Sequence, residues 1–428
     1  MELKQDYASP RWTNEILDCS MPMTFDTYSK CSYHCLYCFS FYQKSHTLDG
    51  YDSNKNNIRA IRSVKPQKVI HLFESALSND IENSSTTEKP FFPYIQERRI
   101  MQWGGLADAF DEYERQLGIT LELLKYFDSI DYPLSFSTKA AWWTNDNRYM
   151  DLFKKHTHNW HVKVSIITTN VKKARAIEKG CPTPQKRLEA IKRLADAGIH
   201  VTLRLRPYII GISGDWKELI SQAHAAGADS VTVEFFCMEG RADTELKLRY
   251  DEMSKVCGFN IWDFYMHYSK QQGYKRLSRA IKAPIIYAMR DFIHGLGMRF
   301  HVSDMFCREC NDACNCCGVP PEWNVNQCGH IGEAILIARE KGFVRFSDIA
   351  DSAKKFFANF GWCNAPGYNI NNSRNRALYF ETTMFEYIRN NWNKISSGNS
   401  PARGYGGILI PYDVDECGDV IYKYNGSR

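Results

Sequence analysis

The stretch from Met23 to Cys38 reads Met-Thr-Phe-Asp-Thr-Tyr-Ser-Lys-Cys-Ser-Tyr-His-Cys-Leu-Tyr-Cys and joins a β-rich run to a loop with three cysteines. Residues 23–28 predict a strand. Cys31, Cys35 and Cys38 follow, separated by three and then two residues. Three thiolates at this spacing can each bind one iron of a cubane [4Fe-4S] cluster and leave the fourth iron without a protein ligand. Structural zinc is the alternative, but it takes four ligands, and His34 is the nearest candidate for a fourth.

The chain after this loop alternates short β-rich runs with amphipathic helical runs, which is typical of a parallel sheet with crossover helices. Six strands are predicted: 23–28, 99–103, 133–137, 161–167, 200–206 and 230–236. Helices are predicted over 69–77, 112–127, 184–197 and 216–226, with Thr183 as an N-cap before Pro184 and Gly198 as a stop. The expected fold class is α/β, a partial (β/α)6 barrel whose chemistry lies at the carboxyl ends of the strands.

Length and composition point to a soluble enzyme core with an appended domain. The 428 residues are 24% charged and 44% hydrophobic, close to ordinary globular usage. We expect a core over residues 1–240 and an α-rich, Cys-rich domain over 241–428, with helices near 277–295 and 324–341. The start of the chain lacks a secretion signal and no apolar run is long enough to span a bilayer, so a cytoplasmic protein without a membrane partner is expected. In a reducing compartment, clustered cysteines are better read as metal ligands than as disulfides.

With its three-cysteine loop, the sequence resembles the radical S-adenosylmethionine (SAM) superfamily, whose signature is Cys-x3-Cys-x-aromatic-Cys after the first barrel strand. More narrowly, it is similar to the branch that includes spore photoproduct lyase and bacterial DNA repair photolyases. The likeness covers roughly the first 240 residues. It is carried by the stretches 25–38, 104–110, 137–139, 164–166, 182–188 and 206–211.

The resemblance implies a [4Fe-4S] cluster on the catalytic cysteines Cys31, Cys35 and Cys38, with SAM on its open iron. Such an enzyme cleaves SAM reductively to a 5′-deoxyadenosyl radical and needs an electron donor of the flavodoxin or ferredoxin type. The implied SAM contacts are Tyr37, Gly104, Gly105, Asp108, Lys139, Ser165 and Arg206. Arg204 and Arg206 alternate with apolar neighbours and face one side of their strand, so a salt bridge to Glu234 is an equal alternative for them.

One departure bears on the reaction. In spore photoproduct lyase a cysteine just ahead of the retained Asp returns a hydrogen atom to the product radical. The corresponding position here is Gly105, so thymine-dimer reversal by that route is not expected. Cys181 and Cys237 are other thiols that could donate hydrogen, although a buried, inert thiol is the more ordinary interpretation of each.

A second group of cysteines lies in the predicted C-terminal domain. Cys307, Cys310, Cys314, Cys316, Cys317 and Cys328 fall in one loop-rich segment with His330 nearby. This density predicts a metal site, either an auxiliary iron–sulfur cluster or zinc, with redox-active or metal-free thiols as the remaining alternative. The segment partly resembles the auxiliary-cluster domain of peptide-modifying radical SAM enzymes, but Pro320 stands where that pattern has its next cysteine.

The substrate class is predicted from basic and aromatic residues downstream. A basic run comprises Lys270, Lys275, Arg276, Arg279 and Lys282, and a second group mixes Tyr368, Arg374, Arg376, Tyr379 and Trp392. Such mixtures suit base stacking and phosphate contact, although a basic helix face is usually just solvated. We therefore expect a nucleic-acid modifying or repair enzyme. A peptide or protein maturase acting on a protein partner is the second hypothesis, and a non-catalytic nucleic-acid or partner-binding module is the third.

Overall fold

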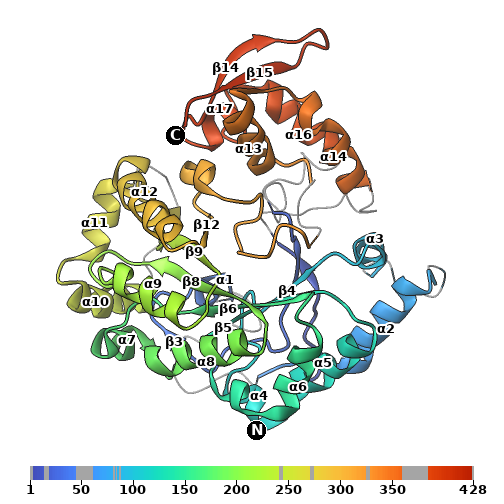
Figure 1. Ribbon diagram of the computed structural model, residues 1–428, viewed down its shortest axis with the longest axis vertical. Coiled ribbons are helices and arrows are strands. Elements are labelled where there is room, and N and C mark those ends of the chain that lie inside the picture. The colour runs from blue at the N-terminus through green and yellow to red at the C-terminus, as the bar shows by residue number, and fades with distance from the viewer. Residues whose placement is uncertain are drawn as a thin grey trace. The chain divides into compact units, whose positions relative to one another are not determined.

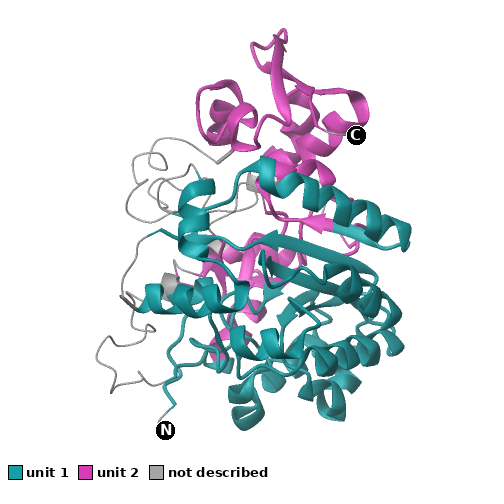
Figure 2. Cartoon of the chain, turned by 90° about the vertical axis from the view of Figure 1, so that its left-hand side faces the viewer, with its two compact units in different colours: residues 1–9, 25–66, 102–300 teal, residues 10–24, 67–101, 301–428 magenta. Residues whose placement is uncertain are grey.

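A computed structural model describes residues 3–13, 19–44, 61–80, 82, 84–85, 88–240, 244–269, 274–323, 328–358 and 384–426 of the chain. The chain divides into two compact units (Figure 2). Unit 1 comprises residues 1–9, 25–66 and 102–300, and unit 2 comprises residues 10–24, 67–101 and 301–428. The division differs from the one expected at residue 240, because residues 241–300 group with unit 1.

The main sheet has eight strands in the order β1-β2-β4-β5-β6-β8-β9-β12. Their bounds are β1 Arg11–Trp12, β2 Met23–Phe25, β4 Met101–Trp103, β5 Leu134–Thr138, β6 Trp160–Ser165, β8 His200–Tyr208, β9 Ser230–Phe235 and β12 Arg299–Val302. Strands β5, β6, β8 and β9 pair in parallel, whereas β1 is antiparallel to β2. Neighbouring strands follow one another along the chain without a reversal of order, as in a barrel, and the sheet stays open at β1 and β12. The predicted α/β partial-barrel class and its six strands are confirmed, while β1 and β12 were not predicted.

Helices α5 (Ile119–Ser129), α6 (Asn147–Lys155), α8 (Pro184–Asp196) and α9 (Trp216–Ala225) lie beside the parallel strands of unit 1 (Figure 1). Helix α8 begins as predicted, because the Thr183 side chain accepts a hydrogen bond from the Lys186 amide and Pro184 is its first residue. The prediction of one continuous helix over 112–127 was wrong, because the structure has two helices there. Gly118, with φ of 68°, separates α4 (Glu112–Leu117) from α5, since its left-handed backbone ends one helix before the next begins.

The parallel strands carry apolar residues on one face and polar residues on the other. Val162, Val164, Leu203 and Leu205 are fully buried and alternate with His161, Lys163, Thr202 and Arg204. The polar residues form a ladder across the strands: His161 lies 3.0 Å from Ser135 Oγ and 2.7 Å from Thr202 Oγ1, and Thr202 reaches Ser230 at 2.6 Å. The apolar face is the one that helices cover in such folds. The other is a buried polar surface, the feature expected of a barrel interior that holds a polar ligand.

Unit 2 contains α2 (Pro66–Leu77) from Gln67 onward, α3 (Phe92–Gln96), α13 (Ile331–Lys341), α14 (Ser347–Ala358), α16 (Met384–Asn393) and α17 (Pro401–Gly404). It also has an antiparallel sheet of β13 (Phe343–Val344), β15 (Val420–Tyr424) and β14 (Leu409–Val414) that the sequence did not predict. Trp392 lies in the core of this unit, with its indole nitrogen donating to the Val420 carbonyl. None of the helices in the described part of the chain is long and apolar enough to cross a membrane.

Candidate functional site

The three-cysteine loop is fixed at both ends by other segments of unit 1. His34 and Cys35 form the short strand β3, which pairs antiparallel with β7 (Glu178–Lys179), and the Leu36 amide donates to the Ile177 carbonyl at 2.9 Å. At the start of the loop, the Ser32 amide donates to an Asp111 carboxylate oxygen at 2.5 Å. The backbone around the cysteines is therefore held in place by main-chain bonds and a buried carboxylate.

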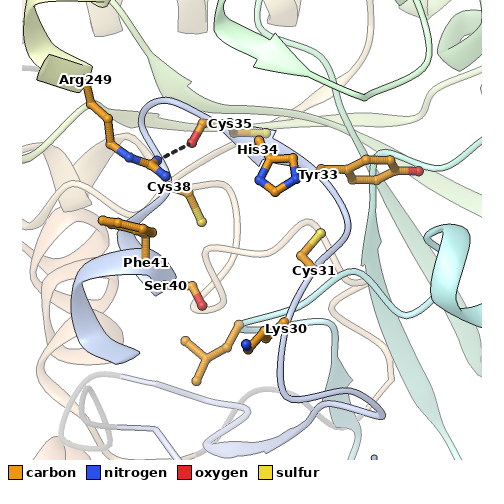
Figure 3. A pocket seen from close by; sticks show the side chains of 10 residues that line it. Lys30, Cys31, Tyr33, His34, Cys35, Cys38, Ser40, Phe41 and Arg249 are labelled. Atoms are coloured by element: carbon orange, nitrogen blue, oxygen red, sulfur yellow. Dashed lines mark hydrogen bonds between the residues drawn. The ribbon is translucent and has the colours of Figure 1, made fainter. Parts of the chain in front are cut away.

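Cys31, Cys35 and Cys38 line one open pocket with about 400 Å³ of free space. Figure 3 shows Cys31 and Cys38 on the loop around this pocket, with Arg249 reaching the loop from α10 (Thr244–Cys257). The Arg249 guanidinium donates to the Cys35 carbonyl at 3.2 Å and lies 3.7 Å from the Phe41 ring centroid. Sequence reasoning missed Arg249, because an arginine in an ordinary amphipathic helix carries no signal of its contact.

The environment of the three thiols is uneven. Burial raises the pKa of Cys31 well above its usual range, and the nearby carboxyls of Asp111 and Asp108 raise it further. Burial likewise raises the pKa of Cys38. The pKa of Cys35 is lowered instead, chiefly because the Cys181 thiol lies 3.7 Å from its sulfur and hydrogen-bonds to it. Binding to a metal would have to remove the protons of Cys31 and Cys38, since the thiolate is the ligand form.

Tyr37, predicted to lie beside the cofactor, anchors the loop through a buried chain of polar groups. Its hydroxyl donates to Glu178, and Glu178 forms an ion pair with Arg187 at 2.5 Å. Arg187 also donates to the Ser165 carbonyl at 2.7 Å, at the carboxyl end of β6. Sequence reasoning gave no role to Glu178 or Arg187, and Glu178 stands in a stretch without a recognisable motif.

Gly104 and Asp108 shape the loop after β4. Gly104 has a φ of 91°, and a Cβ there would lie 2.5 Å from the Ser137 carbonyl oxygen, so the backbones of these two strand ends touch. Asp26 accepts hydrogen bonds from the amides of Leu106 and Ala107 at 2.8 and 3.0 Å, a contact that sequence reasoning missed. The loop is thus held against β2 and β5.

Asp108 was predicted to bind SAM, and the structure places it in a supporting position. Its carboxylate accepts from Thr138 Oγ1 at 2.7 Å, from the Phe110 amide at 3.0 Å and from the Lys139 amide at 2.6 Å. Three internal donors occupy the buried carboxylate, so its evident role is to fix the end of β5 and, with it, Lys139.

Lys139 lies close to the cysteine loop, with its ammonium 5.7 Å from the Tyr37 ring centroid. Burial alone would lower the pKa of Lys139, but Cys35 and Glu178 outweigh it and raise that pKa above its usual range. Lys139 is therefore a cation beside the cysteine thiols, placed to bind an anionic group.

Ser165 lies at the carboxyl end of β6, as predicted. Arg206 lies on the polar face of the sheet, as the alternation along its strand predicted. Ser165 is 1% exposed, and it pairs in register with Arg204 of β8. Arg206 forms an ion pair with Glu234 of β9, with its Nε 2.8 Å from the carboxylate. The structure thus shows the salt bridge that was the alternative to a direct cofactor contact for Arg206.

The Cys-rich segment forms a buried cluster within unit 2. Cys307, Cys310, Cys314, Cys317 and Cys328 are at most 6% exposed, and Cys316 is half-buried. The Cys314 sulfur lies 4.0 Å from His330 Nε2 and 3.5 Å from Ser20 Oγ. An Arg99 guanidinium nitrogen lies 3.6 Å from the Cys328 sulfur. Burial nevertheless raises the pKa of the Cys328 thiol, and Arg99 offsets that rise only in part, so binding to a metal would have to remove the proton of Cys328.

His330 is better placed as a hydrogen-bond donor than as a metal ligand. Its Nδ1 accepts from the Glu333 amide at 3.3 Å and so caps α13. A neutral imidazole that accepts at Nδ1 carries its proton on Nε2, which faces Ser20 and Cys314. Cys314, Cys328 and the other thiols therefore remain the candidate ligands of this segment.

Comparison with known proteins places this chain among remote relatives. No family model matches it. Uncharacterized proteins of Mycobacterium tuberculosis and Mycobacterium bovis are 24% identical over 246 residues, which is 54% of this chain and 66% of each relative's length. Spore photoproduct lyase complexed with dinucleoside spore photoproduct aligns over 70% of this chain and 80% of its own, with 14% identity and a TM-score of 0.48. SuiB of Streptococcus suis aligns over 66% and 49%, with 12% identity and a TM-score of 0.40. These similarities are remote, so a proposal for the function has to be argued from the site residues themselves.

Proposed function

We propose that this protein is a radical SAM enzyme, with Cys31, Cys35 and Cys38 as the ligands of a [4Fe-4S] cluster. The observation that carries the proposal is the gathering of these three thiols around one pocket at the strand ends of a partial barrel. When bound, the cluster supplies the electron that cleaves SAM to a 5′-deoxyadenosyl radical.

The spacing of the thiols supports a cluster over a single zinc ion. A tetrahedral zinc ion with bonds of about 2.3 Å needs its sulfur ligands about 3.8 Å apart. Among the residues that the structure describes, the sulfur atoms of the three cysteines do not all lie within 4.8 Å of one another, so at least one pair is wider than a zinc site requires. A cubane distributes its ligands over separate irons and accommodates wider spacing.

The chain's own residues supply the rest of the proposed SAM site. Lys139 is the cation for the carboxylate of SAM. The main chain at Gly104 and Gly105, which have no side chains, is proposed to bind the amino group of SAM. Ser165 and the polar face beneath it offer hydrogen-bonding groups to the ribose. Asp108 acts through Lys139, and Glu178 acts through Tyr37, as positioning residues.

The decisive test is reductive SAM cleavage by protein assembled anaerobically with iron and sulfide. With dithionite, the wild type should release 5′-deoxyadenosine, and the triple variant Cys31→Ala, Cys35→Ala, Cys38→Ala should release none. Cys257→Ala is the matched control, since this half-buried thiol does not line the pocket. Tetrahedral zinc in place of iron at these cysteines, with no SAM cleavage, would overturn the proposal.

A nucleic-acid substrate is our proposal for the substrate class, and it was suggested by basic and aromatic residues together with the sequence resemblance. Of the residues that suggested it, Lys282 is 1% exposed and Trp392 is fully buried, so neither belongs to a binding surface. Lys275, Arg276 and Arg279 are half-buried, while Lys270, Tyr368, Arg374, Arg376 and Tyr379 lie outside the described residues. Binding to single-stranded DNA or RNA should weaken steeply between 50 and 200 mM salt. Absence of binding at the lower salt would instead favour a peptide substrate.

The Cys-rich segment of unit 2 is proposed to hold a second metal centre. Its support is the burial of five thiols and the two donors, Arg99 and His330, that face two of them. Iron–sulfur and zinc are the two candidate occupants. Among the described residues, no three ligand atoms of this segment all lie within 4.8 Å of one another, so zinc would require the thiols to move closer together. Metal analysis distinguishes the two.

A further inference from the structure

A group of histidine and aspartate side chains lies at the amino ends of β5 and β6. Asp128 and Asp131 stand at the end of α5 and before β5, and His156 and His158 stand between α6 and β6. Lys139 and Ser165 mark the carboxyl ends of the same strands, roughly 17 Å away for a five-residue strand. The group is therefore separate from the proposed active site and uses none of its residues.

The potential ligand atoms of Asp131, His156 and His158 already converge. Asp131 Oδ1 lies 3.0 Å from His156 Nδ1 and 3.1 Å from His158 Nε2. All three ligand atoms lie within 4.8 Å of one another. A tetrahedral zinc ion with bonds of about 2.0–2.1 Å places its ligand atoms about 3.3 Å apart, so the two distances from Asp131 would lengthen by a few tenths of an ångström, and the two histidine nitrogens, which lie within 4.8 Å, would have to reach the same spacing.

The other ring nitrogen of His156 is already oriented by a carboxylate. His156 Nε2 lies 2.9 Å from Asp128 Oδ1, and Lys155 holds Asp128 from the other side at 3.0 Å. An imidazole that donates its Nε2 proton to Asp128 presents the lone pair of Nδ1 to Asp131 and His158. Carboxylate–histidine pairs of this kind orient histidine ligands in metal sites.

The ring of His156 is also fixed by packing. Its side chain is 5% exposed, and it stacks on Trp160 with ring centroids 4.2 Å apart. Asn159 donates to Asp131 Oδ1 at 2.8 Å and holds that carboxylate in place. Asp131 and His158 are exposed, so an ion would reach them from solvent and complete its coordination with water.

We propose that Asp131, His156 and His158 form a binding site for a divalent ion of the zinc class, with Asp128 as the positioning residue for His156. Nitrogen and oxygen ligands of this kind suit zinc and distinguish the site from both cysteine groups. A bound ion would link the connection before β5 to the connection before β6 and stabilise this end of the sheet.

The test uses the full chain with its cysteine sites loaded beforehand with iron and sulfide. After equilibrium dialysis against zinc and gel filtration, the wild type should retain one more zinc per chain than His158→Ala. Asp131→Asn, which keeps both histidines, should lose the same equivalent. The zinc-dependent rise in Tm should be lost in both variants, while their Tm without zinc should stay close to that of the wild type, since both side chains are exposed.

His200→Ala is the matched control. His200 pairs with Asp229 through Nδ1 at 2.6 Å in the same unit, but no second histidine joins that pair in the described structure. This variant should retain the full zinc content. Equal zinc in the wild type and His158→Ala would overturn the proposal, and so would an equal loss in His200→Ala.

Discussion

The Glu178–Arg187 ion pair supports the cysteine loop through Tyr37. Both side chains are 1% exposed, and Glu178 joins Tyr37 of the loop to Arg187 at the end of β6. Glu178→Gln should destabilise the protein by about 3–5 kcal/mol, because it leaves the buried guanidinium without its counter-charge. Urea unfolding of the two proteins measures the difference in the free energy of unfolding. Glu189→Gln is the control, since its pair with Arg193 is exposed and should contribute less than about 0.5 kcal/mol.

The same pair sets a pH dependence. Burial alone would raise the pKa of Glu178, but Arg187 and Lys139 outweigh it and lower that pKa below its ordinary value. A carboxyl with a lowered folded-state pKa contributes stability above its unfolded pKa, about 4.3, and loses that contribution as the pH falls through the folded value. Unfolding free energies measured from pH 7 down to pH 3 should therefore fall less in Glu178→Gln than in the wild type. Parallel curves for the two proteins would contradict the lowered pKa.

Among the elements around the proposed SAM site, the turn after β4 tolerates little change at Gly104. Gly104→Ala would place a Cβ 2.5 Å from the Ser137 carbonyl oxygen at a residue with a left-handed backbone. Gly118 also has a positive φ, but a Cβ added there would have no other atom within 4 Å. Gly118→Ala should cost about 1–2 kcal/mol for the left-handed backbone alone. Gly104→Ala should cost more than this and should also weaken SAM binding, because β4 and β5 must separate near Lys139. If both variants lost the same free energy of unfolding in urea, the close approach between Gly104 and the Ser137 carbonyl would contribute nothing to stability.

Strand positions could be predicted because each strand alternates apolar and polar residues, and the class of the fold followed from their spacing. The missed elements lack that local signal: β1 and β12 are short edge strands, and the break at Gly118 depends on one backbone angle. The three cysteines were predicted to bind a cluster from their spacing, and the SAM-cleavage assay of the triple variant tests that prediction. Glu178, Arg249 and Asp26 were missed, because their contacts depend on which distant segments meet in space.

At the scale of the whole molecule, the two cysteine groups belong to different compact units, each with its own buried surroundings. We therefore expect the metals that we propose for the two groups to be lost independently. The triple variant at Cys31, Cys35 and Cys38 should lose SAM cleavage and one cluster signal in electron paramagnetic resonance, yet keep the metal of unit 2. Cys314→Ala with Cys328→Ala should do the reverse, and Cys417→Ala, an exposed thiol, should change neither. Iron, zinc and sulfide analysis of each variant measures the outcome. If the triple variant lost all metal, the buried thiols of unit 2 would have to be assigned a role in packing alone, despite the Arg99 guanidinium beside Cys328.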